Sequence, residues 1–189
     1  IDKLIVATNE NDILKRVIDT GEYKPDQAKP SFSPSMDIQV SSNFERLLFN
    51  IVGEDDKRVS LLMNELSSKG FFKLSREEVG IIKKDFCAEK INNKDTLSIM
   101  EEVEMKSNFI LDPHTATAVG AAKKTSNLSD TVVLGTAHPY KFLETVKMAT
   151  GKDVQTPTQL SKIENKKEKY DILENNISEI KNYILEKIA

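Results

Sequence analysis

The chemically versatile residues of this chain lie on polar loops that follow apolar runs. Residues 4–7 are continuously apolar, and Asn9, Asn11 and Asp12 come shortly after them. In open parallel sheets, ligands bind beyond the carboxyl ends of the strands, where such loops lie. These amide and carboxylate groups could line a cofactor or substrate pocket. Asn9 or Asn11 could equally cap the next helix, because short polar side chains satisfy free amides at a helix start.

A second loop of the same kind begins at Gly135, after the apolar run 131–134. Gly135 permits a tight turn, and Thr136 offers a hydroxyl group. A helix that starts at Pro139 would expose free amides and the positive end of its dipole. On local pattern alone, we favour the interpretation that Thr136 and His138 cap this helix.

Few other side chains suggest a reaction centre by themselves. His114 and His138 are the only histidines, and both fall at expected helix starts without a third metal ligand in a motif. Capping or packing is therefore favoured over a metal site or an acid–base pair. Ser35 and Asp37 end a proline-rich loop that either folds over a substrate or starts the next helix. Arg46 and Lys141 could bind a phosphate group, but a surface position explains each of them better.

The composition excludes several classes of protein. The 189 residues are 39% hydrophobic and 30% charged, with 27 basic against 30 acidic side chains, which is typical of a soluble globular protein. The basic residues near the C-terminal end alternate with glutamates, so we expect no nucleic-acid partner. No run approaches the roughly 20 apolar residues that span a membrane. One cysteine, Cys87, excludes a disulfide framework and favours a reducing, cytoplasmic setting and a packing role.

The first elements that must position these residues are a strand and a helix. Residues 4–7 predict a strand buried on both faces, as in parallel sheets. Helical spacing of apolar residues from Ile13 predicts a helix that Gly21 ends. The prolines and serines of residues 23–37 predict an irregular loop.

The middle of the chain is predicted to form several successive helices. Apolar residues at helical spacing predict helices from Phe44, from Val59 to Gly70, over residues 75–90 and from Asp95. This segment is therefore expected to be a helical insertion between pieces of a sheet.

Further regular elements are expected toward the C-terminal end. Asp112 followed by proline predicts a helix cap and a helix of small residues that packs closely on a sheet. Residues 131–134 predict a second buried strand, and Pro139 predicts the start of another helix. The stretch 170–188 has an apolar stripe at helical spacing. We favour a helix docked on the body, with a partner-binding helix as the alternative.

Four motifs together resemble the threonine synthase family. They occur in the family's order, and the match is close over about the first 150 residues and looser in the tail. The last of the four is the most specific. The motifs are ATNEND at residues 7–12, PSMDI at 34–38, LDPHTA at 111–116 and GTAHPYKF at 135–142.

The resemblance implies an α/β fold, the fold-type II architecture of pyridoxal-phosphate enzymes. This chain would be its helix-rich C-terminal part, with few buried parallel strands and a helical insertion. The implied reaction converts O-phospho-L-homoserine and water to L-threonine and phosphate, with pyridoxal 5'-phosphate as the cofactor. The Schiff-base lysine and the glycine-rich phosphate loop of this architecture are expected upstream of Ile1, in an N-terminal part of the same enzyme. The isolated chain is then expected to be inactive.

The resemblance also implies roles for particular residues. Thr136 falls where these enzymes place a hydroxyl against the pyridine nitrogen of the cofactor. A neutral hydroxyl can donate a hydrogen bond to an unprotonated nitrogen, whereas a carboxylate would keep that nitrogen protonated. The candidates for the substrate pocket are Asn9, Asp12, Ser35, His114, His138 and Lys141. No metal ligands are implied.

The expected division of the chain follows from these elements. Residues 1–37 and 108–151 would belong to the cofactor domain, 38–107 would be the helical insertion, and 152–189 a linker and amphipathic helix. Two alternatives remain at this stage. One is another fold-type II enzyme, such as a threonine or serine dehydratase, and the other is a non-catalytic helical binding module.

Overall fold

The structure is a computed structural model that describes residues 1–125, 130–163 and 166–188. Its contacts divide the chain into two units, residues 1–155 and 156–189, and each is described by itself. The candidate site residues all lie in the first unit.

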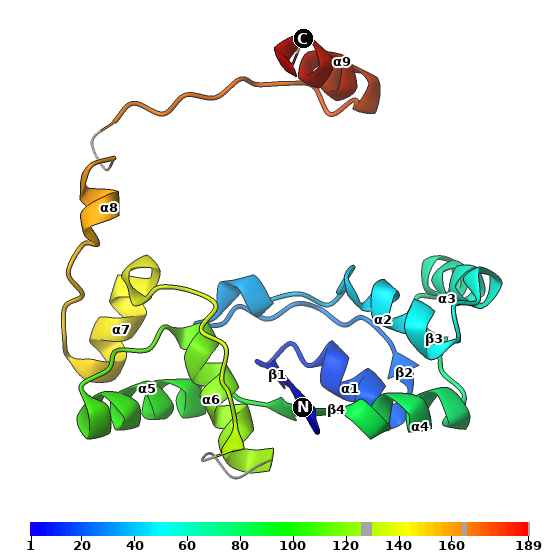
Figure 1. The fold of residues 1–189 in the computed structure, drawn as a ribbon, viewed down its shortest axis with the longest axis horizontal. Helices are drawn as coiled ribbons and strands as arrows, with labels where there is room; N and C mark the ends of the chain where they lie inside the picture. Colours follow the sequence, from blue (N-terminus) through cyan, green and yellow to red (C-terminus); the bar gives the residue numbers. More distant parts are fainter. Residues whose placement is uncertain (126–129, 164–165, 189) are drawn as a thin grey trace. The chain divides into compact units, whose positions relative to one another are not determined.

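The centre of the first unit is a two-stranded parallel sheet (Figure 1). Strand β1 (Leu4–Thr8) pairs with strand β4 (Phe86–Lys90), so that Leu4 lies opposite Phe86 and Thr8 opposite Lys90. The predicted first strand is therefore confirmed, although its apolar residues are half-buried or exposed and not fully buried. Side chains alternate across a strand, and Val6 accordingly faces one core while Ile5 and Ala7 face another.

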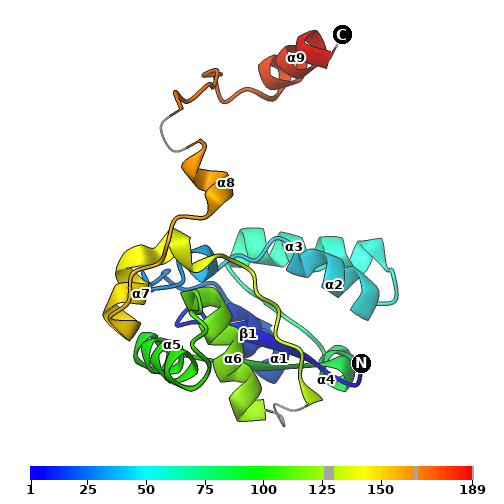
Figure 2. The same ribbon diagram turned by 60° about the vertical axis from the view of Figure 1, so that its left-hand side comes forward.

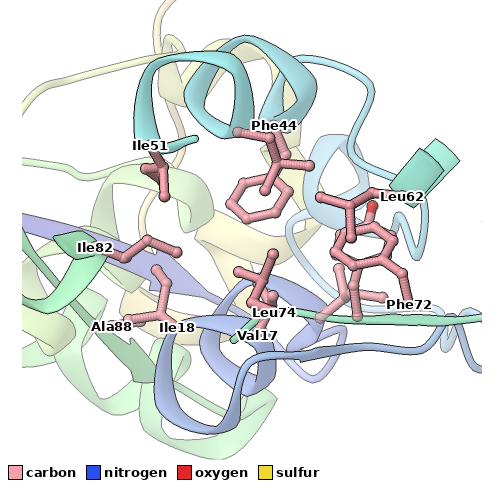
Figure 3. Close-up of a cluster of buried hydrophobic side chains, with 12 residues drawn as sticks. Val17, Ile18, Phe44, Ile51, Leu62, Phe72, Leu74, Ile82 and Ala88 are labelled. Atoms are coloured by element: carbon pink, nitrogen blue, oxygen red, sulfur yellow. The ribbon is translucent and has the colours of Figure 1, made fainter. Parts of the chain in front are cut away.

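The first core lies on the Val6 side of the sheet and is covered by four helices. It is built around Val17 and Leu48, which are fully buried, and around three stacked aromatic rings. The ring of Tyr23 stacks on Phe72 at 4.8 Å and on Phe44 at 5.5 Å. Figure 3 shows the Phe44 ring above Leu74 and Val17, with Leu62 and Phe72 to its right. The helices are α1 (Ile13–Thr20), α2 (Phe44–Ile51), α3 (Asp56–Lys69) and α4 (Arg76–Asp85).

A short antiparallel pair closes this core at one end. Strand β2 (Glu22–Tyr23) pairs with strand β3 (Phe72–Lys73) and brings the stacked rings into register. Between β2 and α2 the backbone has no regular structure except for the short 3-10 helix η1 (Pro34–Met36). The predicted irregular loop is thus confirmed over most of its length.

The second core lies on the other side of the sheet. Helices α5 (Asn93–Ser107), α6 (Pro113–Thr125) and α7 (Leu143–Thr150) enclose Met100, Ala116 and Val146, each of them fully buried. Figure 2 shows α6 crossing β1 on the side opposite to α1. Gly120 allows α6 to approach α5, because a methyl group there would lie only 2.6 Å from Ile99 Cδ1. The expected close packing of the small-residue helix is confirmed.

The helix boundaries follow from local chemistry. Gly21 and Gly70 end α1 and α3 in the left-handed conformation, both with φ of 79°. Ser75 and Glu78 form a reciprocal capping box at the start of α4, which fixes that boundary. The sequence predictions for these ends are confirmed.

Two predicted elements are wrong. The helix expected over residues 75–90 ends at Asp85, and the following residues form β4, because they complete the hydrogen-bonded ladder with β1. The stretch predicted to be helical throughout therefore contains a central strand. Residues 131–134 form no strand, and Val132 and Leu134 are 86% and 72% exposed. Cys87 is half-buried on β4, as expected of a packing residue, though on a strand and not on a helix.

The second unit contains two helices in its described residues. Helix α8 (Thr158–Ser161) is a single turn, and α9 (Ile177–Ile188) carries the predicted apolar stripe. The helix expected over the stripe from Leu173 to Ile188 is confirmed from Ile177 onward, and the residues before it are not helical. Ile177 and Ile188 are exposed, so docking of this helix and partner binding by it both stay predictions. None of the described helices is long and apolar enough to cross a membrane.

Candidate functional site

The carboxyl end of β1 leads directly into a buried polar network. Asn9 is 2% exposed, and its Nδ2 donates to Asp37 Oδ1 at 2.7 Å and to Ser31 Oγ at 2.7 Å. Nδ2 also lies 3.0 Å from Ser33 Oγ. The network attaches the proline-rich loop to the sheet edge, which is where a parallel sheet places its ligand sites.

Asn11 extends this network, but neither asparagine caps a helix. Asn11 Nδ2 donates to Asp37 Oδ1 at 3.0 Å, and its backbone amide donates to Asn9 Oδ1 at 2.8 Å. The residue that precedes α1 is Asp12, and its side chain makes no capping hydrogen bond. The capping alternative for Asn9 and Asn11 is therefore excluded, and both side chains are occupied in holding the loop.

Asp12 is held by two cations. Its carboxylate lies 3.0 Å from Arg16 Nε and 3.0 Å from Lys90 Nζ, which joins the start of α1 to the end of β4. Burial acts to raise the pKa of Asp12, but hydrogen bonds and charge attraction from Lys90 and Arg16 lower it below the ordinary value of 3.8. Asp12 therefore has a structural role, because its ion pairs connect helix α1 with strand β4.

The start of α6 holds a buried histidine. Asp112 is 2% exposed, and its Oδ1 accepts from the His114 backbone amide at 2.9 Å and lies 3.1 Å from His114 Nδ1. His114 Nε2 accepts from the backbone amide of Ser35 at 3.2 Å. Because Nε2 is an acceptor, Nδ1 carries the proton and donates to Asp112. The expected packing role of His114 is confirmed.

The turn that carries Thr136 lies against the same helix start. A methyl group added at Gly135 would lie 3.9 Å from Thr115 Oγ1, an ordinary contact distance. Thr136 is exposed, and its hydroxyl makes no hydrogen bond to any described residue, so it does not act as a cap. The Nδ1 of His138 accepts from the Tyr140 amide at 3.1 Å at the start of the 3-10 helix η3 (Pro139–Phe142). The capping interpretation is thus confirmed for His138 alone.

The two basic candidates lie on different elements. Lys141 is exposed, and its Nζ lies 5.9 Å from the centroid of the Phe142 ring. Arg46 lies on α2 and lines an open groove of about 730 Å³ together with Asn43, Phe49 and Val59. Neither Asn9, His114 nor any of their hydrogen-bond partners lines that groove. Lys141, in contrast, precedes Phe142, whose ring contacts His114, so of these two basic residues Lys141 is the one beside the candidate site.

The candidate site therefore consists of loops that Asn9 and His114 hold in place by hydrogen bonds, and two of its hydroxyl groups are exposed. Ser35 and Thr136 are both exposed, and neither hydroxyl has a partner among the described residues. Within the same part of the chain, no three His, Cys, Asp or Glu side chains are grouped to hold a metal ion. Free hydroxyls on rigid loops can orient a bound molecule by hydrogen bonding.

The comparison with known proteins identifies the family. Residues 115–184 match the family model "Threonine synthase, C-terminal". The chain is 37% identical over 187 residues to a threonine synthase of Pseudomonas aeruginosa, covering 97% of this chain and 40% of that protein. It is 36% identical to the threonine synthase of Saccharomyces cerevisiae, covering 100% of this chain and 42% of that protein.

The chain belongs to the threonine synthase family. Solved threonine synthase structures share its fold. The structure titled "PLP bound Threonine synthase" from Brucella melitensis has a TM-score of 0.86 at 39% identity, covering 97% of this chain and 40% of that one. The yeast enzyme has a TM-score of 0.81 at 32% identity, covering 100% of this chain and 42% of that one. The predicted helix-rich α/β fold is confirmed, and the chain spans about two fifths of the length of these threonine synthases.

The sequence analysis missed part of the site. Ser31 and Ser33 were assigned no role, yet both accept hydrogen bonds from Asn9. Asp112 was predicted only as a helix cap, and it also holds the His114 ring. The serine pattern at positions 31, 33 and 35 was the one available signal, because alternate polar residues in a proline-rich loop indicate a segment with its own hydrogen-bonded order.

Proposed function

We propose that this chain is the C-terminal part of a threonine synthase. The whole enzyme would convert O-phospho-L-homoserine and water to L-threonine and phosphate, with pyridoxal 5'-phosphate as its cofactor. The similarity to threonine synthases extends over nearly the entire chain, and one of the related structures is bound to this cofactor. The free Thr136 hydroxyl beside the start of α6 is the observation in this chain that carries the proposal.

Thr136 would hold the cofactor ring at its pyridine nitrogen. An exposed hydroxyl without a partner among the described residues fits that role, because it can donate to the nitrogen without giving up an existing bond. Pyridoxal phosphate, when bound, supplies an electron sink for charge that develops at the substrate's α-carbon. A neutral donor leaves the nitrogen unprotonated and moderates this withdrawal, whereas a carboxylate at the same place would strengthen it.

Other residues of the site would orient the substrate. The Ser35 hydroxyl and the Lys141 ammonium are exposed on segments that touch His114 or its partner Phe142, and they are the proposed contacts. Asn9, Asp12, His114 and His138 would act indirectly, since their side chains are already engaged. The proposal retains the division of the chain into a cofactor domain, 1–37 with 108–151, and an inserted segment, 38–107.

The cofactor lysine and the phosphate loop would come from an N-terminal part of the same enzyme. The isolated chain would then be inactive and would need that part as its partner. Its single cysteine is half-buried, which agrees with a protein that works in the reducing cytoplasm.

The test uses the full-length protein that carries this chain. Pyridoxal phosphate absorbance is recorded while O-phospho-L-homoserine is added, and threonine and phosphate are both assayed. We expect the parent protein to release threonine and phosphate in equal amounts, and we expect the same of Thr136→Ser. Thr136→Val removes one hydrogen bond to the cofactor and should lower kcat/KM by about 10- to 100-fold.

Thr136→Asp separates the proposed role from a general defect. This variant should shift the cofactor absorbance, because a carboxylate stabilises the protonated nitrogen. A parent protein that binds no pyridoxal phosphate, or that releases phosphate without threonine, contradicts the proposed function. Equal rates for the parent and Thr136→Val contradict the role of Thr136 alone.

A further inference from the structure

The buried His114 contacts two loops that each carry a free hydroxyl group. The residue is 7% exposed, and its Nε2 accepts from the Ser35 backbone amide at 3.2 Å. The other contact is with Phe142, whose ring centroid lies 4.8 Å away at an angle of 51°. One side chain thus touches both the loop of Ser35 and the segment that follows Thr136.

The turn of Thr136 rests on the start of α6 at both of its ends. On one side, Gly135 lies beside Thr115, as the 3.9 Å distance to an added methyl group indicates. On the other side, Phe142 lies on His114. The Thr136 hydroxyl between these two contacts has no partner in the described part of the chain, whereas Gly135 and Phe142 on either side of it are in contact with α6.

Asp112 fixes the orientation of His114. The Asp112 carboxylate accepts from the backbone amides of His114 and Thr115 and from the Thr115 hydroxyl, and it holds His114 Nδ1 at 3.1 Å. This contact keeps the proton on Nδ1 and leaves Nε2 free to accept. A buried carboxylate and imidazole arranged in this way fix both the orientation and the tautomer of the ring.

We propose that His114 is a positioning residue that fixes the Ser35 hydroxyl relative to the Thr136 hydroxyl. The inference rests on the proposed function, in which Thr136 touches the cofactor and Ser35 the substrate. His114 touches neither and acts through the backbone amide of Ser35 and the ring of Phe142. Small errors in the placement of such groups lower rates strongly, so a residue that sets their spacing affects turnover without taking part in the reaction.

Two variants of His114 separate its contacts in the full-length protein. His114→Asn keeps a donor near the position of Nδ1 but has no atom at the position of Nε2, and it lacks the ring. His114→Gln reaches the position of Nε2 with its amide oxygen, so it restores the acceptor for Ser35 but not the contact with Phe142. Ile82→Val, a change in the first core, is the control for a general loss of stability.

The first readout is amide hydrogen exchange, measured without cofactor in peptides that cover residues 31–37 and 136–143. His114→Asn should exchange faster in both peptides, by about tenfold at Ser35, whose amide loses its acceptor, and measurably in 136–143, which loses the ring contact with Phe142. His114→Gln should restore protection in 31–37 and leave 136–143 fast. Unchanged exchange in either peptide of His114→Asn overturns the inference, as does equal acceleration in Ile82→Val.

The second readout is kcat/KM of the full-length protein with the cofactor bound. His114→Asn should lower kcat/KM about tenfold with the cofactor still bound, and His114→Gln should recover part of that loss. Full activity of His114→Asn overturns the inference. If the parent itself makes no threonine, the proposed function fails, while the exchange data still decide whether His114 connects the two loops.

Discussion

Asn9 and Asp37 are joined side chain to side chain, with Asn9 Nδ2 lying 2.7 Å from Asp37 Oδ1. Asp37 also accepts from the Ser31 hydroxyl at 2.6 Å and from the Ser31 amide at 2.8 Å. Among the described residues, no lysine or arginine forms an ion pair with this carboxylate. The Asp37 carboxylate therefore accepts its hydrogen bonds from uncharged groups. These bonds fix the proline-rich loop to the end of β1.

Asn9→Ala should destabilise the protein by about 2–3 kcal/mol, because it removes donors from a partly buried carboxylate. Urea unfolding of the full-length protein measures the change. Gln27→Ala is the matched control, since Gln27 lies exposed on the same loop and its side chain has no partner among the described residues. Equal midpoints for the two variants would show that the network does not stabilise the loop.

Glu78→Gln should lower stability in a pH-dependent manner. The bidentate hydrogen bonds from Arg58, at 2.8 and 2.9 Å, are the largest cause of a Glu78 pKa below its ordinary value of 4.5. A lowered pKa means that the native state binds the proton more weakly than the unfolded state does. Its contribution is therefore fully present above pH 4.5 and is lost as the pH falls through the lowered pKa.

The expected loss for Glu78→Gln at pH 7 is about 1–3 kcal/mol, and it should shrink as the pH falls below 4.5. Thermal unfolding at a series of pH values measures it. Glu77→Gln is the control, because Glu77 is exposed in the same first turn of α4. If the stability lost in Glu78→Gln stayed the same at pH values well below 4.5, the ion-pair explanation would be contradicted.

Gly120→Ala should destabilise by about 1–3 kcal/mol although alanine is the better helix former, because the added methyl group overpacks the core. It would lie 2.6 Å from Ile99 Cδ1 and 3.0 Å from Ile91 Cδ1. Gly80→Ala in α4 is the matched control, since nothing other than its chain neighbours and the backbone of its own helix lies within 4 Å of the added methyl group. Gly80→Ala should stabilise by up to about 1 kcal/mol. Shifts of the same sign in melting temperature would refute this distinction.

Tyr23→Phe should cost about 1–3 kcal/mol, because the buried Ser41 amide would lose its acceptor. The Tyr23 hydroxyl accepts from this amide at 2.7 Å, and Tyr23 is 2% exposed. Burial raises the pKa of this phenol, so its contribution is neutral hydrogen bonding at pH 7. Tyr170→Phe, at a position 70% exposed, should leave the urea midpoint unchanged.

Local chemistry made much of the fold predictable. The apolar run before Thr8, the glycines after α1 and α3 and the Asp112-Pro113 cap each act within a few residues, so their signals are complete in the sequence. Strand β4 was missed because its residues follow a helix without a break, and only pairing with β1 determines their conformation. Residues 131–134 show the reverse case, since branched apolar residues form a strand only where a partner strand exists.

The sequence suggested which loops to consider for a site, but not the contacts within them. The rule that ligands bind at the carboxyl ends of strands pointed to the loop of Asn9, which follows β1. The loop of Thr136 was proposed from an expected strand over residues 131–134, which the structure does not form. The contact between His114 and Ser35 joins residues 79 positions apart, and no spacing pattern encodes such a bond. The role of His114 as an acceptor for a backbone amide therefore required the structure.

The pairing of β1 with β4 also sets an order of events during synthesis. Ile5 pairs with Cys87, so within this chain β1 leaves the ribosome long before its partner strand does. The intervening helices can form as they emerge, but the sheet between the two cores cannot. Nascent chains arrested before Phe86 should thus be cleaved by protease near β1, and chains arrested well beyond Lys90 should be protected there.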